Sequence, residues 1–154
     1  MNSIVAPEKV PFFRLELEEQ EIDSVVSVMR TGWLTTGSQA MEFEKEFASY
    51  VGGGVEAVAV NSNTAGMHLA LEALGIGPVD EVIVPTLTFT ATAEVILYLV
   101  ADPVIVDVDP DDLCIDVDAA AAAVTPRTRA IMPVHFGGMP CRMDRIHGLA
   151  KSAG

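Results

Sequence analysis

The sequence predicts an α/β fold with a mostly parallel sheet flanked by helices. Short apolar stretches alternate with segments of helical period, and small or hydroxylated residues separate the two. Strands that are apolar along their whole length are typical of parallel sheets covered on both faces. The chain has 154 residues, half of them hydrophobic, which is enough for about one domain with a buried core.

Two helices are expected before the sheet, over residues 18–30 and 39–50. The first has four apolar residues on one helical face, Ile22, Val25, Val26 and Met29. The second has Phe43 and Phe47 four residues apart and is followed by three glycines. These helices resemble an arm added to the sheet.

From residue 57 onward, strands and helices alternate. We expect strands over residues 57–60, 81–84, 103–108 and 129–134, and helices over 64–74, 90–100, 116–124 and 143–153. Asp116 or Asp118 lies near the start of the third of these helices, where an acidic side chain is favourable. The acidic segment 107–116 lacks the glycine and glutamate of a calcium loop, so a solvated turn around Pro110 is expected.

Composition excludes several classes of protein. A formal net charge of −13 argues against binding to nucleic acid or to an anionic membrane surface. No secretory signal and no spanning segment is recognisable, and two cysteines are too few for a disulfide framework. We therefore expect a cytoplasmic protein with free thiols at Cys114 and Cys141 and no metal site.

The first candidate site is the turn between the strand expected at 57–60 and the following helix. It reads Asn-Ser-Asn-Thr-Ala-Gly from residue 61. Free N–H groups at a helix N-terminus favour an anion such as a phosphate group. The alternative is that Ser62 or Thr64 simply caps the helix, and on this turn alone capping is favoured.

Two further turns follow later strands. The turn at residues 85–90 carries Phe89, which either stacks on a flat ligand or belongs to the core. The turn at residues 134–140 carries His135, which either contacts a ligand or is a buried core histidine. Together, the first two turns suggest a phosphorylated, planar, aromatic ligand. No dinucleotide fingerprint, Walker A motif or nucleophile elbow is present.

The ordered series of motifs resembles the DegT/DnrJ/EryC1/StrS family of sugar aminotransferases, which use pyridoxal 5′-phosphate (PLP). The motifs, in chain order, are GWLTTG from residue 32, NSNTAGMHLAL from 61, LGIG from 74, DEVIVP from 80, TFTAT from 88, PRTRAI from 126 and VHFGGMP from 134. Each motif is weak alone, but the series covers nearly the whole chain in the right order. The stretch from residue 61 is most similar to the branch that makes aminoarabinose for lipid A.

The resemblance implies the N-terminal part of a large domain of the aspartate-aminotransferase type, fold type I, in a homodimer with sites at the subunit interface. Residues 1–38 would form an arm, a helix and a substrate-side loop, and residues 39–154 an incomplete PLP-binding domain. Asn63, Thr64 and Ala65 would hold the PLP phosphate, and Phe89 would stack on its pyridine ring. Thr35 and Thr36 would lie on the substrate side. Asn63 departs from the family pattern, which has a small residue there, although backbone contacts to phosphate would survive the change.

The family's catalytic residues have no counterpart in this sequence. The aspartate that pairs with the pyridine nitrogen and the lysine that forms the Schiff base belong to later motifs of the family. The lysines present, Lys9, Lys45 and Lys151, do not follow a strand in a serine-rich context. The resemblance thus implies the front of an enzyme that transfers an amino group, typically from glutamate, to a keto sugar nucleotide. The chain alone is expected to be inactive, and the competing hypothesis is a non-catalytic interaction module.

Overall fold

The computed structural model describes residue 11 and residues 13–153, which form two compact units. The first unit is Met1–Ala59 and the second is Val60–Gly154. The boundary between these units follows Ala59, whereas the division expected at residues 38 and 39 separated an arm from a cofactor domain. Among the described residues, no helix combines the length and the apolar composition needed to cross a membrane.

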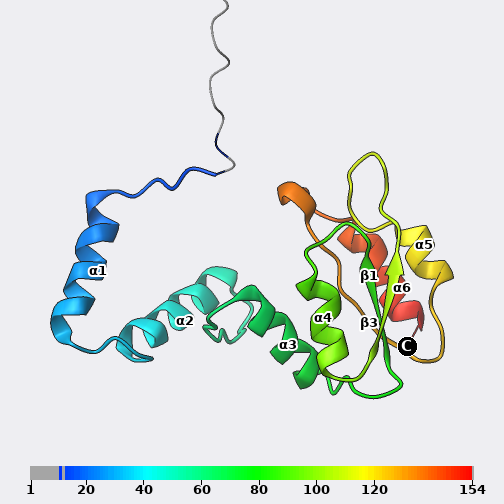
Figure 1. The fold of residues 1–154 in the computed structure, drawn as a ribbon, viewed down its shortest axis with the longest axis horizontal. Coiled ribbons are helices and arrows are strands. Elements are labelled where there is room, and N and C mark those ends of the chain that lie inside the picture. Colours follow the sequence, from blue (N-terminus) through cyan, green and yellow to red (C-terminus); the bar gives the residue numbers. More distant parts are fainter. Residues whose placement is uncertain (1–10, 12, 154) are drawn as a thin grey trace, which may run out of the picture. The chain divides into compact units, whose positions relative to one another are not determined.

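The first unit contains the two expected helices, α1 (Glu19–Thr31) and α2 (Ser38–Val51) (Figure 1). Helix α1 begins with a capping box, in which the Glu18 N–H donates to Glu21 Oε2 at 2.9 Å. It ends at Gly32, whose φ of 75° is left-handed and is adopted at low cost by glycine. Both helices agree with the prediction to within one residue.

The strand expected over residues 57–60 is not formed, and that prediction is wrong. The segment is not paired with any strand in the described part of the chain, and Val58 is 77% exposed. One of its backbone groups is satisfied by a side chain instead, since the Ala59 N–H donates to Glu44 Oε1 at 2.8 Å. Apolar sequence alone does not make a strand, because a strand also needs a neighbour for its hydrogen bonds.

The second unit contains a parallel sheet of three strands, β1 (Glu81–Pro85), β2 (Asp102–Val106) and β3 (Thr128–Ile131). The strand order is β2-β1-β3, and Ile83 of β1 lies opposite Val104 on one side and Ile131 on the other. All five residues of β1 are buried. The central strand is therefore continuously apolar after Glu81, as expected for a parallel sheet.

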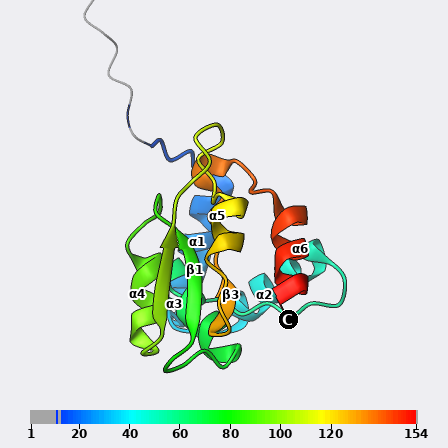
Figure 2. The same ribbon diagram turned by 90° about the vertical axis from the view of Figure 1, so that its right-hand side faces the viewer.

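Helices cover both faces of this sheet, as Figure 2 shows for α4 and α6. Helices α3 (Asn63–Ala73) and α4 (Ala91–Tyr98) contribute to a core cluster that contains Val82 and Val84 of β1. Helices α5 (Val117–Ala122) and α6 (Met143–Ala153) contribute to a second cluster that contains Ile83. Adjacent residues of β1 thus point to opposite cores, which follows from the period of two in a strand.

One arginine links all three strands at the amino end of the sheet. Arg127, just before β3, forms ion pairs with Glu81 of β1 and, at 2.8 Å, with Asp102 of β2. Glu81 is only 5% exposed, and the Thr125 hydroxyl also donates to its carboxylate. Asp102 and then Glu81 raise the pKa of Arg127 above its usual value. This buried carboxylate is fully paired, which is what makes its burial tolerable.

The acidic segment 107–116 is a turn, as expected, but its carboxylates are not simply solvated. Asp109 accepts from the Asp111 N–H and Asp112 from the Cys114 N–H, both at 2.9 Å. Arg142 at the start of α6 pairs with both carboxylates, at 2.9 and 3.4 Å. The acidic residues therefore fold the turn and tie it to α6.

Candidate functional site

The strand order places a candidate site at the carboxyl edge of the sheet. From β1 the chain runs through α4 to β2 on one side, and it then crosses through α5 to β3 on the other side. The strand order therefore reverses between β1 and β3. In open parallel sheets, ligands bind beyond the carboxyl ends of the strands at such a reversal.

The N-terminus of α3 is capped by a neutral side chain. Ser62 Oγ accepts from the Ala65 N–H at 3.1 Å, and the Ser62 carbonyl accepts from the Gly66 N–H at 3.1 Å. These two bonds leave the N–H groups of Asn63 and Thr64 unpaired among the residues that the structure describes. The capping interpretation is confirmed for Ser62, yet a cap of this kind leaves two donors available for a ligand.

Charge distinguishes α3 from the other helices of this unit. Helices α4, α5 and α6 each carry an acidic residue in the first turn, Glu94, Asp118 and Asp144 respectively. Helix α5 is also capped by the Asp116 carboxylate, which accepts from the N–H groups of Asp118 and Ala119. The first turn of α3 has no acidic residue and its cap is neutral. In this strongly acidic chain, the positive end of the α3 dipole is thus left uncompensated by charge.

Phe89 lies on the surface, so the core interpretation of this residue is wrong. Its side chain is 78% exposed. The turn around it is fixed, because the Thr88 and Thr92 hydroxyls lie 2.8 Å apart and the Thr92 N–H donates to the Phe89 carbonyl at 3.0 Å. Thr92 is itself buried. A large aromatic ring is therefore presented to solvent by a rigid turn at the end of β1.

His135 is also exposed, so it is not a buried core histidine. It follows β3 and precedes the short helix η1 (Phe136–Gly138). Its Nδ1 accepts a hydrogen bond from the Cys141 N–H at 3.0 Å. A neutral ring that accepts at Nδ1 carries its proton at Nε2, which makes Nε2 a donor. Ligand contact by His135 stays a prediction.

Thr35 and Thr36 are exposed residues of the first unit, in the loop between α1 and α2. The Trp33 indole N–H closes this loop by donating to the Thr36 carbonyl at 3.0 Å. Thr35 also lines an open cavity of about 470 Å³ between the two helices. The substrate-side role of the two threonines stays a prediction.

The second unit contains the predicted residues 63–65, Phe89 and His135 on neighbouring elements. Residues 63–65 begin α3 and Phe89 precedes α4, and these two helices pack on each other through Leu71, Val95 and Ile96. His135 follows β3, the strand that neighbours β1. The sequence interpretation missed the contact between His135 and Cys141 and the pairing of Glu81 with Arg127. The signal for the pairing of Glu81 with Arg127 was an acidic residue at the start of one apolar strand and a basic residue just before a later one.

The lysines that the structure describes are unlike a cofactor-anchoring residue. Lys45 on α2 is exposed and pairs with Glu42 at 3.3 Å, and Lys151 is exposed in the last turn of α6. Lys9 lies outside the described residues. A lysine that reacts at neutral pH needs desolvation or a neighbouring cation, and neither lysine has such a setting. Within residues 11 and 13–153, no cluster of three or more His, Cys, Asp or Glu could hold a metal ion.

Comparisons with known proteins agree on one family. Residues 15–154 match the model of the DegT/DnrJ/EryC1/StrS aminotransferase family. The chain is 48% identical over 145 residues to the spore coat polysaccharide biosynthesis protein SpsC of Bacillus subtilis, covering 94% of this chain and 37% of that protein. The chain thus spans little more than a third of the length of this relative.

Solved structures give the same result. The putative sugar aminotransferase Spr1654 from Streptococcus pneumoniae, in its PMP form, matches with a TM-score of 0.87 and 38% identity, over 94% of this chain and 36% of that one. NtdA from Bacillus subtilis with bound cofactor PMP matches with a TM-score of 0.85 and 34% identity, over 97% of this chain and 35% of that one. The fold is that of PLP-dependent aminotransferases of fold type I. The chain belongs to the DegT/DnrJ/EryC1/StrS aminotransferase family.

Proposed function

We propose that this chain carries the phosphate- and ring-binding part of a PLP-dependent sugar aminotransferase. The observation that supports it most is the N-terminus of α3, which is neutrally capped, free of acidic residues in its first turn and left with two N–H donors. These features fit the phosphate group of PLP. Phe89, exposed on a rigid turn before the neighbouring helix, fits the flat ring.

Each residue would have a separate task. The N–H groups of Asn63, Thr64 and Ala65 would hold the phosphate, although the Ala65 N–H would have to share its donor with Ser62 Oγ. Phe89 would stack on the pyridine ring and fix its plane. Thr35 and Thr36 would contact the sugar substrate. When bound, PLP supplies an electron sink for moving an amino group, typically from glutamate, to a keto group of a nucleotide-linked sugar.

We further propose that the 154-residue chain does not transaminate by itself. Lys45 and Lys151 are exposed surface residues without the setting of a reactive lysine. Such a chain would associate as a homodimer or with a C-terminal half. Only the C-terminal half would supply the anchoring lysine and the ring-pairing aspartate, because a second copy of this chain brings the same residues. The alternative, a non-catalytic interaction module of the same ancestry, predicts no specific binding of the cofactor.

The test is calorimetric titration of the chain with pyridoxamine 5′-phosphate (PMP) and with pyridoxamine. PMP lacks an aldehyde, so it does not react with surface lysines. We expect PMP to bind and pyridoxamine, which lacks the phosphate, to bind at least tenfold more weakly. Phe89→Ala should weaken PMP binding, whereas Tyr98→Ala, an exposed aromatic at the other end of α4, should not. Equal affinity for the two ligands, or no heat for either, would refute the proposal.

A further inference from the structure

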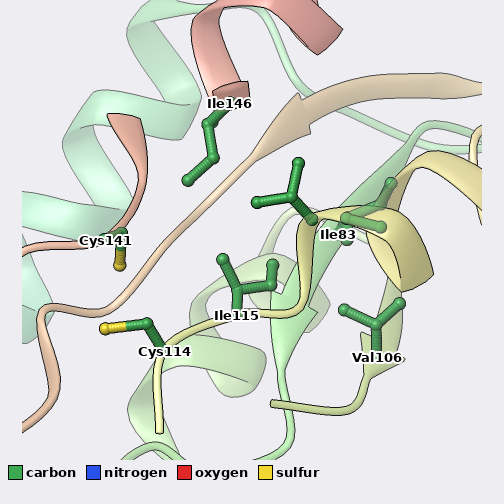
Figure 3. Packing of buried hydrophobic residues seen from close by; sticks show 8 residues of the cluster. Ile83, Val106, Cys114, Ile115, Cys141 and Ile146 are labelled. Atoms are coloured by element: carbon green, nitrogen blue, oxygen red, sulfur yellow. The ribbon is translucent and has the colours of Figure 1, made fainter. Parts of the chain in front are cut away.

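The two cysteines of the chain lie in one buried cluster. Cys114, in the turn before α5, is 1% exposed, and Cys141, just before α6, is 5% exposed. Figure 3 shows their side chains directed toward each other from different loops. Neither has a role in the proposed cofactor site, so their juxtaposition calls for a separate explanation.

Backbone hydrogen bonds fix both residues in place. The Cys114 N–H donates to Asp112 Oδ1 at 2.9 Å, and its carbonyl accepts from the Asp109 N–H at 2.9 Å. The Cys141 N–H donates to His135 Nδ1 at 3.0 Å, and its carbonyl accepts from the Met143 N–H at 2.7 Å. These hydrogen bonds fold the two loops so that both cysteines belong to the same buried cluster.

Oxidation would remove only two weak hydrogen bonds that the thiol groups donate. Cys114 Sγ donates to the Met139 carbonyl at 3.4 Å, and Cys141 Sγ donates to the Val134 carbonyl at 3.1 Å. Thiols are weak donors, so loss of these two bonds is a small cost. Burial and then the Cys114 thiol raise the pKa of Cys141 from 9.0 to about 11.

We propose that Cys114 and Cys141 form a modification site, in which the two thiols convert reversibly to a disulfide that ties the 107–116 turn to the loop after β3. The inference is independent of the proposed function. The oxidant is a small-molecule disulfide such as oxidised glutathione. One cysteine thiolate attacks it and releases one thiol, and the second cysteine then attacks the mixed disulfide and releases the other. In total, one S–S bond forms, one breaks, and the two electrons and two protons of the cysteines end on the two released thiols.

The same bond would alter the loop that carries His135. Oxidation removes both thiol donors from the carbonyls of Val134 and Met139, which flank His135 and the η1 turn. It also moves Cys141 toward Cys114, and the Cys141 N–H is the group that holds His135 Nδ1. The ring signals of His135 should therefore shift on oxidation, while those of His147, exposed on α6, should not.

The experiment exposes the folded chain to oxidised glutathione and analyses it by non-reducing electrophoresis and mass spectrometry. We expect a monomer lighter by two hydrogen atoms. Trypsin cleaves after Arg127 and Arg129 and so separates the cysteines, which should remain linked until dithiothreitol is added. Cys114→Ser should yield only a glutathione adduct on Cys141, and the urea-unfolded chain provides the matched control for reactivity.

Three results would overturn the proposal. The first is a separate glutathione adduct on each cysteine of the folded chain. The second is a disulfide between two copies of the chain. The third is a pair of thiols that stay free under conditions that oxidise both thiols of the unfolded chain.

Discussion

The single residue Ser62 has both a structural and an electrostatic role at the start of α3. Its hydroxyl caps α3, and its neutrality leaves the helix N-terminus attractive to an anion. Substitutions of Ser62 distinguish the capping role from the electrostatic role. Ser62→Ala should lower the free energy of unfolding by about 1 kcal/mol, because the cap is lost.

Ser62→Asp should keep the stability, since aspartate is an equally good cap, but its negative charge should weaken PMP binding severalfold. Ser62→Asn, a neutral cap, should keep both properties. Urea denaturation and PMP titration of the three variants check the prediction. An aspartate variant that binds PMP as tightly as the unsubstituted chain would show that the phosphate lies elsewhere.

Cys141 gives the chain a distinct response to alkali. Because burial raises the pKa of this thiol to about 11, the unfolded chain releases the proton at lower pH than the folded chain does. Stability from this group is therefore present below about pH 9 and is lost as the pH rises toward 11. The total loss is of order 3 kcal/mol. Urea denaturation at several pH values should show this extra loss, and Cys141→Ala should remove it. Parallel curves for both chains would contradict the assignment.

Sequence patterns located residues better than they located contacts. The motif around residues 61–66 predicted a helix start capped by Ser62 or Thr64, and Ser62 is the cap, because capping is a local property of neighbouring residues. The exposure of Phe89 and the bond from Cys141 to His135 could not be predicted from residue type, since both depend on how separate loops fold together.

Strand β1 is the central strand of the described sheet and is paired with a neighbouring strand on both sides. Ile83 at its centre is completely buried, whereas Ile105 on the edge strand β2 is 60% exposed. Ile83→Val should reduce the free energy of unfolding by about 1 kcal/mol. Ile105→Val is the matched control and should change it by less than about 0.5 kcal/mol. Equal effects in urea denaturation would mean that β1 is not the centre of the core.

Helices were more predictable than strands for a physical reason. The bounds of α1, α2, α3 and α6 agree with their sequence patterns to within a residue or so, because helix hydrogen bonds join residues four apart. Residues 57–60 have strand-like composition, yet they form no ladder in the described structure. Pairing is non-local, and composition does not say whether a partner strand is available.

At the scale of the whole molecule, the chain spans little more than a third of its relative SpsC and exposes several apolar side chains, Val58, Phe43 and Ile105 among them. We expect these surfaces to favour association.

The described lysines lack the setting of a cofactor-anchoring residue, and this leads to a prediction about PLP labelling. Reduction with borohydride in the presence of PLP should leave no single lysine labelled stoichiometrically, as judged by peptide mass spectrometry. One dominant adduct at Lys9, Lys45 or Lys151 would contradict the view that this chain lacks the anchoring residue.

A map of backbone amide NMR shifts during titration with PMP tests most directly whether the N-terminus of α3 binds the phosphate. If α3 holds the phosphate, the amides of Asn63, Thr64 and Ala65 move first and furthest, together with those of the turn around Phe89. Pyridoxamine should move them little. Shifts centred on the acid-bearing N-termini of α5 or α6, or no saturable shift at all, would contradict the assignment of α3 as the phosphate site.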